Sequence, residues 1–265
     1  EIYSEIAALD PSHQPTLEAL TSMMLSGVEP LPAAEVLERV YREAGECEKL
    51  AEVREAQIRH TEDSGDRVEM LQQLADLYEI QLEDAPAAFH SFARALPLDI
   101  HNEHSLASLE RLAEQTGSWN EVAALYDKEV SRLREESPDA VTDLAMRSAM
   151  VNEVQLDDVD AAIDRYSIVV DIDPANAKAI EALDRLYEQT ERWDDLAATL
   201  QIEAAVATTP EEVLNLQFRA GQLFQNQLAN MESAISQYRD ILAAAPEYAP
   251  AVSALEEMFA SGVRP

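Results

Sequence analysis

The chain repeats itself, and this repetition restricts its possible folds more than any other feature. Segment 109–122 recurs as segment 183–196, 74 positions later, with mainly conservative replacements. Similarity at a fixed internal spacing is typical of stacked repeat proteins. In such a stack each repeat contacts its neighbours, and the array remains one domain however long it grows. We therefore expect residues 1–265 to form a single array and to offer a surface for binding rather than a catalytic pocket.

The repeating unit is 72–74 residues long and contains two similar halves. A four-residue motif, Gln81-Leu82-Glu83-Asp84, recurs at 155–158 and 227–230. The segment after each motif carries a small residue, an aromatic residue and a further apolar residue: Ala88, Phe92 and Ala95; Ala162, Tyr166 and Val169; Ala234, Tyr238 and Ile241. Half a unit is about 37 residues, which suits a helix, a tight turn and a second helix.

Composition and helix-start signals predict an all-α fold. The chain has only 6 glycines and is 47% hydrophobic, which favours helices over a β-sandwich or barrel. Ser137-Pro138 and Thr209-Pro210 pair a capping hydroxyl with proline in the first turn. The expected helices span 2–9, 14–26, 32–44, 47–60, 66–81, 85–96, 103–116, 119–135, 138–155, 158–171, 176–190, 193–207, 210–227, 231–244 and 248–260. Segment 14–60 holds one helix more than the repeat pattern requires.

These motifs resemble the tetratricopeptide repeat (TPR) family. On first helices the resemblance rests on Leu74-Ala75 with Tyr78, Leu183-Asp184 with Tyr187, and Ala220-Gly221 with Phe224. On second helices it rests on the alanine and aromatic positions above and on closing prolines at Pro174 and Pro246. The resemblance implies a right-handed superhelical solenoid of antiparallel helix hairpins, with first helices lining a concave groove. It also implies a scaffold that holds peptides or partner proteins there.

Alternate second helices depart from the family pattern. They begin with Trp119 or Trp193 and carry a valine or leucine where the small alanine belongs. We interpret both tryptophans as core residues that wedge between neighbouring hairpins, rather than as ligand-stacking residues. Cys47 is the single cysteine, which excludes an internal disulfide. Because it aligns with Trp119, we interpret it as a small core residue.

The charge limits the kinds of partner. A formal net charge of −33 repels phosphate backbones and argues against nucleic-acid binding. It suits a basic protein or peptide, although acidic residues also keep an extended surface soluble, and a saline habitat would favour the same excess. No apolar run reaches the 18 residues that a membrane span needs. Segment 1–10 lacks a signal-peptide pattern, so we expect a cytoplasmic protein, with an upstream leader left open.

The sequence contains no recognisable catalytic constellation, so we expect neither an enzyme nor a cofactor. There is no phosphate-binding glycine loop and no nucleophile elbow. His101 and His104 are three positions apart but lack a third ligand, and we expect no metal. Acidic pairs such as Asp194-Asp195 fall at helix starts, where they favour the helix dipole.

Residues at equivalent surface positions of the first helices are the candidate groove: Arg39, Asp76, Arg111, Gln115, Met150, Arg185, Gln189 and Gln222. They could line a mixed surface for an extended peptide or a partner helix. The alternative is that they pair with nearby acids as ordinary solvated surface.

The start of the chain matches its end at a spacing of 235, as in Tyr3 and Tyr238, Pro11 and Pro246, and Gly27 and Gly262. The chain thus re-enters its own beginning, which suggests a piece of a longer array. We expect a non-enzymatic scaffold that binds a protein or peptide. Two alternatives stay open: a regulatory or spacer array within a larger enzyme or signalling protein, and a structural array that self-associates through exposed repeat ends.

Overall fold

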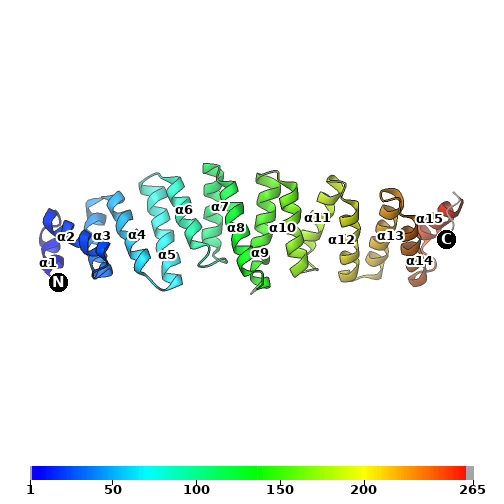
Figure 1. The fold of residues 1–265 in the computed structure, drawn as a ribbon, viewed down its shortest axis with the longest axis horizontal. Helices are drawn as coiled ribbons and strands as arrows, with labels where there is room; N and C mark the ends of the chain where they lie inside the picture. The colour runs from blue at the N-terminus through cyan, green and yellow to red at the C-terminus, as the bar shows by residue number, and fades with distance from the viewer. Residues whose placement is uncertain (1, 136, 261–265) are drawn as a thin grey trace. The chain divides into compact units, whose positions relative to one another are not determined.

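The chain is all-α, as predicted. The computed structural model describes residues 2–135 and 137–260, which contain fifteen α-helices, two π-helical turns and no strand (Figure 1). The α-helices are α1 (Ile2–Leu9), α2 (Gln14–Ser26), α3 (Pro30–Ala44), α4 (Cys47–His60), α5 (Ser64–Asp76), α6 (Ala85–Ala95), α7 (Glu103–Thr116), α8 (Trp119–Leu133), α9 (Pro138–Met150), α10 (Val159–Ile172), α11 (Ala177–Gln189), α12 (Trp193–Val206), α13 (Pro210–Asn226), α14 (Met231–Ala244) and α15 (Ala249–Ala260). The π-helical turns are η1 (Leu77–Gln81) and η2 (Val151–Gln155). Gly262, one of the residues matched at the spacing of 235, lies outside the described residues.

Two compact units make up the chain. Unit 1 spans Glu1–Leu125 and unit 2 spans Tyr126–Pro265, so the division falls within α8. Within each unit the helices form a ladder, in which consecutive helices are antiparallel and pack on one another. In unit 2, α9 packs on α10, α11 on α12, and α13 on α14. Apart from α1, α2 and α15, odd-numbered helices are first helices and even-numbered helices are second helices.

The additional helix predicted in segment 14–60 is present. That segment folds into α2, α3 and α4, where the repeat pattern requires two helices. Helix α2 ends at Gly27, whose φ of 77° lies in the left-handed region that glycine adopts readily. Proline at the first position of α3 then starts a new helix. The insertion packs on α3 and joins the hydrophobic core of unit 1.

The core is built from small residues that face aromatic ones. Ala88, Ala162 and Ala234 are fully buried at equivalent positions of second helices. On first helices Gly221 plays the matching part, since a Cβ atom there would lie 2.5 Å from the Tyr238 ring. Such a distance leaves no room for a side chain, so α13 and α14 approach each other closely only because this position is glycine. Burial raises the pKa of Tyr238 to about 12.

The four-residue motif that marks the repeats is a capping structure. Asp84, Asp158 and Asn230 are N-caps whose side chains each accept a hydrogen bond from the backbone N–H three residues later. These caps satisfy one of the orphan donors at a helix start and each contribute about 1 kcal/mol. The motif therefore fixes where α6, α10 and α14 begin.

The helix end before two of the three motifs differs from what the sequence predicts. Segments 66–81 and 138–155 were expected to be regular α-helices, but each ends in a π-helical turn, η1 or η2. All three motifs contain a left-handed corner, with φ of 53° at Glu83 and Asp157 and 50° at Ala229. The hydrogen bond from the Leu82 N–H to the Leu77 carbonyl, five residues back, also recurs in the third copy, yet α13 ends there as a regular α-helix. The motif therefore does not mark the π-helical turns, which is why they were not predicted.

Hairpins that carry the tryptophans share another left-handed corner. Gly45, Gly117 and Glu191 are equivalent, with φ of 70°, 73° and 56°. In each case the following N–H donates to a carbonyl five residues back, which closes the helix end. In the third copy a glutamate, Glu191, adopts this conformation. Its Cβ atom makes the left-handed backbone less favourable than it is for glycine.

This difference predicts opposite effects of two substitutions. Glu191→Gly should stabilise unit 2 by about 1 kcal/mol, because it removes the left-handed strain of a residue with a Cβ atom. Gly117→Ala should destabilise unit 1 by about 1 kcal/mol through the backbone alone, since nothing lies within 4 Å of a Cβ atom there. Thermal unfolding followed by circular dichroism measures both. Equal melting temperatures for wild type and Gly117→Ala would show that this turn is not left-handed.

Among the described helices, none combines the length and the apolar character needed to cross a membrane.

Candidate functional site

Unit 2 presents an exposed row of side chains on its first helices, which we call the first-helix face. It consists of Met150 on α9, Val154 on η2, Arg185 and Gln189 on α11, and Gln222 and Asn226 on α13, all exposed. Each pair is spaced by four residues, and such spacing places two side chains on one side of a helix. Four of these six residues were predicted for the groove.

Arg185 joins two successive first helices instead of standing free. Its Nη2 atom donates to Oε1 of Glu153 on η2 at 2.6 Å. The other oxygen of Glu153 accepts a hydrogen bond from the hydroxyl of Tyr166 at 2.9 Å. This bond and burial raise the pKa of Tyr166. The carboxylate therefore ties η2 to α10 and α11 together.

The equivalent pair in unit 1 has the same geometry. Arg111 on α7 donates from both terminal nitrogens to Glu79 on η1, at 2.6 and 2.7 Å. This two-pronged hydrogen bond lowers the pKa of the Glu79 carboxyl. Arg111 and Arg185 thus both pair with a nearby acid in the structure. Their guanidinium groups can bind a ligand only if these ion pairs open.

The remaining predicted groove residues of unit 1 are Arg39, Asp76 and Gln115, and all three are exposed. Arg39 has no hydrogen bond or ion pair with any described residue, because the position that would carry the partner of Arg111, 32 residues earlier, is Ala7. Arg39 lies on α3, Asp76 on α5 and Gln115 on α7. The structure places these three in unit 1 and the other candidates, apart from Arg111, in unit 2.

A second set of ion pairs joins successive second helices and was not predicted. Glu55 on α4 binds Arg94 on α6 at 2.6 Å, and Asp127 on α8 binds Arg165 on α10 at 2.6 Å. Opposite charges 38 or 39 residues apart were the available signal. This signal could not be recognised in the sequence, because acidic residues are so abundant that they occur at most spacings from a basic residue.

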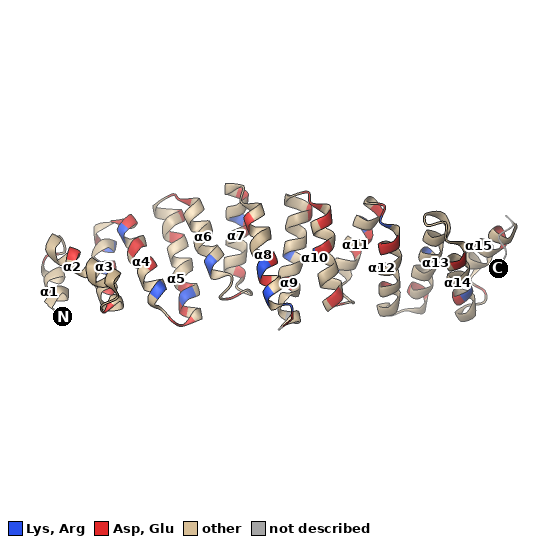
Figure 2. Cartoon of the chain, in the orientation of Figure 1, with Lys and Arg blue, Asp and Glu red and all other residues tan. Residues whose placement is uncertain are grey.

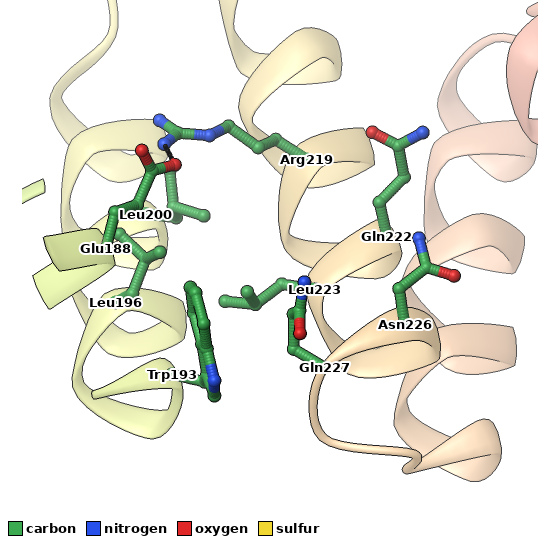
Figure 3. Close-up of a pocket in the computed structure, with 9 residues that line it drawn as sticks. All are labelled: Glu188, Trp193, Leu196, Leu200, Arg219, Gln222, Leu223, Asn226 and Gln227. Atoms are coloured by element: carbon green, nitrogen blue, oxygen red, sulfur yellow. Dashed lines mark hydrogen bonds and ion pairs between the residues drawn. The ribbon is translucent and has the colours of Figure 1, made fainter. Parts of the chain in front are cut away.

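A pocket of about 400 Å³ opens between α12 and α13 beside the first-helix face (Figure 3). Leu196 and Leu200 from α12 and Leu223 from α13 supply its apolar lining. Figure 3 shows Leu223 pointing across the space toward the ring of Trp193. At the other end Arg219 donates to Oε1 of Glu188 at 2.5 Å and to Oδ2 of Asp184 at 2.6 Å. The remaining lining residues are Gln222, Asn226 and Gln227.

Trp119 and Trp193 were predicted to be core residues, and this is wrong, because both rings are partly exposed. Each is the first residue of its helix and lies at the edge of the hairpin. The interior position is taken three residues later by Val122 and Leu196, which are buried. Cys47, at the equivalent position of α4, is likewise half-buried against the core of unit 1.

Comparison with known families supports this reading of the hairpins. Residues 179–214 match the family model described as tetratricopeptide repeat. The chain carries a tetratricopeptide repeat. The match covers α11, α12 and the start of α13, and a TPR hairpin of this kind generally acts as a protein–protein interaction scaffold. The predicted resemblance is confirmed, and the pocket lies within and beside the matched repeat.

Several solved TPR structures are similar to the chain. YrrB, described as a TPR protein with an unusual peptide-binding site, is 14% identical over 74% of this chain and 98% of its own, with a TM-score of 0.34. The C-terminal part of a TPR protein from Cytophaga hutchinsonii is 10% identical, covering 95% and 97%, with a TM-score of 0.37. PilF of Pseudomonas aeruginosa is 12% identical, covering 85% and 96%, with a TM-score of 0.36. No curated protein sequence matches the chain. At these identities no residue role is transferred.

The TPR hairpin contains an acidic cluster around Arg219. Burial raises the pKa of Glu203 on α12, and the negative charges of Asp184 and Glu212 raise it further, while Arg219 acts in the opposite direction. Oδ1 of Asp184 is buried without a hydrogen-bond partner. The Arg219 guanidinium thus interacts with the three carboxyl groups of Asp184, Glu188 and Glu203. Within the described parts of the chain, no three His, Cys, Asp or Glu side chains are grouped to hold a metal ion.

The cluster predicts a pH-dependent effect of Glu203→Gln. Because the pKa of Glu203 is raised in the folded state, its favourable contribution is present at acidic pH and is lost as pH rises through the folded pKa. The neutral amide should therefore stabilise unit 2 at pH 7, by less than about 1 kcal/mol, since water screens this partly exposed group. The gain should vanish below the pKa of an unfolded glutamate, near pH 4. Melting temperatures measured between pH 4 and 8 test this, and a gain that is constant across that range would contradict it.

Proposed function

We propose that the chain is a non-enzymatic scaffold that binds an extended segment of a partner protein on the first-helix face of unit 2. The observation that carries the proposal is the exposure of two neighbouring apolar side chains, Met150 at 53% and Val154 at 66%. Contiguous exposed apolar residues rimmed by polar groups are typical of protein-binding surfaces. Methionine suits such a surface because its flexible side chain adapts to different partners.

Ion pairs between neighbouring helices hold the first-helix face of unit 2 in place. Glu153–Arg185 joins η2 to α11, and the Arg219 pairs join α11 to α13. A face that is already ordered loses little conformational entropy on binding. The exposed amides of Gln189 and Gln222 can pair with the backbone of an extended segment, which offers alternating donors and acceptors. We propose the equivalent residues of unit 1, Arg39, Asp76, Arg111 and Gln115, as a similar surface there, and both units as parts of one array.

The partner segment proposed is basic. The chain carries 52 acidic and 19 basic residues, and Figure 2 shows that acidic residues are spread along both units. Such a surface attracts positive segments and speeds their encounter, an effect that weakens as salt rises.

Selection of random peptides on the immobilised chain tests this function. Peptides enriched at low salt should carry net positive charge and at least one large apolar residue. Replacing Met150 and Val154 by aspartate should reduce binding at least tenfold, because the substitution removes the apolar contact surface.

The matched control is Ile202→Asp with Val206→Asp. These residues are also exposed, apolar and four positions apart, but lie on the second helix α12. This control should bind selected peptides as the wild type does. Equal losses in both variants, or enrichment of acidic peptides, would contradict the proposal.

A second candidate function, self-association, is favoured by α1. Tyr3 is 42% exposed, although the equivalent Tyr238 is fully buried against Gly221. Ile2 and Leu9 on the same helix are also exposed. Sedimentation velocity at rising protein concentration should then show an increase in mass that Tyr3→Asp removes. A constant monomer mass across the concentration range would exclude this second function.

A further inference from the structure

The two tryptophans occupy equivalent positions but differ in their hydrogen bonding. The indole N–H of Trp119 donates to Oε2 of Glu114 at 3.1 Å. The glutamate equivalent to Glu114 is Glu188, which instead binds Arg219 at 2.5 Å. The indole N–H of Trp193 has no hydrogen-bond partner among the described residues, although its ring lines the pocket. The Trp193 nitrogen is not among the buried unpartnered atoms, so its N–H is accessible to an acceptor from outside the chain.

The pocket is apolar at its base and carries no net charge. Leu196 and Leu200 are each 1% exposed and Leu223 is 8% exposed, so they form a closed floor that offers little surface, and the partly exposed ring of Trp193 is the main apolar contact in the pocket. Glu188 is the only acidic lining residue and Arg219 the only basic one, and they pair with each other. A second cation at this end of the pocket would lie beside the Arg219 guanidinium, a like charge that opposes its entry.

We propose that the Trp193 pocket receives an aromatic side chain of the bound segment, with basic residues on either side of it. This inference rests on the proposed function and specifies what the surface selects. A flat ring can stack on or meet edge-to-face with the Trp193 indole, an interaction that an aliphatic side chain lacks. The pocket volume of about 400 Å³ falls within the range of small-ligand sites, which leaves room for a ring and part of its backbone.

Groups around the pocket suit the rest of such a segment. The free indole N–H and the side-chain amides of Gln222, Asn226 and Gln227 offer hydrogen bonds to backbone carbonyl and N–H groups. Glu191 and Asp194, on either side of the Arg192-Trp193 pair in the sequence, are exposed. Their charges lie beside the pocket rather than in it, where they can attract basic flanking residues without desolvation.

A set of four peptides tests the proposal on the full chain. They share the sequence acetyl-Lys-Ala-Gly-X-Gly-Ala-Lys-amide, with phenylalanine, leucine, lysine or alanine at X. The chain has 2 tryptophans, so a ¹⁵N-labelled sample gives two indole N–H signals, assigned with Trp119→Phe and Trp193→Phe. The phenylalanine peptide should shift the Trp193 signal and leave the Trp119 signal in place. Its Kd should be at least fivefold lower than that of the alanine peptide, with leucine between them and lysine no better than alanine.

Substitutions then separate the pocket from the face. Trp193→Ala should abolish the preference for phenylalanine over alanine, while Trp119→Ala, its matched control, should keep it. The indole signals of the unsubstituted chain keep the test valid even if a variant unfolds. Binding that is equal for all four peptides, that prefers lysine, or that leaves the Trp193 signal unmoved would overturn the pocket and leave the proposed function standing. Absence of binding by every peptide would overturn both.

Discussion

Close approach of neighbouring helices is the constraint on which the rest of the structure depends. Where α13 meets α14, the Tyr238 ring occupies the volume that any side chain at Gly221 would need. The equivalent positions of the two preceding repeats hold Ala75 with Phe92 and Ala149 with Tyr166, and all four side chains are buried. Once this distance is set, the longer side chains at the helix edges can reach from one hairpin to the next. The ion pairs of Glu79, Glu153 and Arg219 are a consequence of this packing, not its cause.

The ion pairs in turn shape the surface that a partner meets. Of the few basic side chains, Arg94, Arg111, Arg165, Arg185 and Arg219 are each held by a carboxylate of a neighbouring hairpin. Partly exposed pairs of this kind add little stability individually, and they follow from the spacing that the buried contacts set. They also remove positive charge from the solvent, so the unpaired surface charge is mostly acidic.

The fold could be predicted from the sequence because the signals for helix starts and helix ends repeat. Helix-start signals such as Ser137-Pro138 and Thr209-Pro210 marked the starts of α9 and α13 to within about two residues. The π-helical turns could not be predicted, because the third copy of the same motif follows the regular end of α13 and the motif therefore does not mark them. The groove positions on first helices were identified from their periodicity. Periodicity carries no information on partners elsewhere in the chain, so it could not decide whether Arg185 pairs with an acid, and it missed the exposure of Trp193.

The left-handed corner at Glu191 has a consequence for local dynamics. In a ladder of repeats, stability is shared between neighbours rather than pooled in one core, and segments with backbone strain open at lower free energy. Glu191 lies two positions before Trp193, so a turn with left-handed backbone strain adjoins the wall of the pocket. Local opening of this turn would move Trp193 relative to the buried Leu196 and Leu200, and the width of the pocket would change while the helices stay in place.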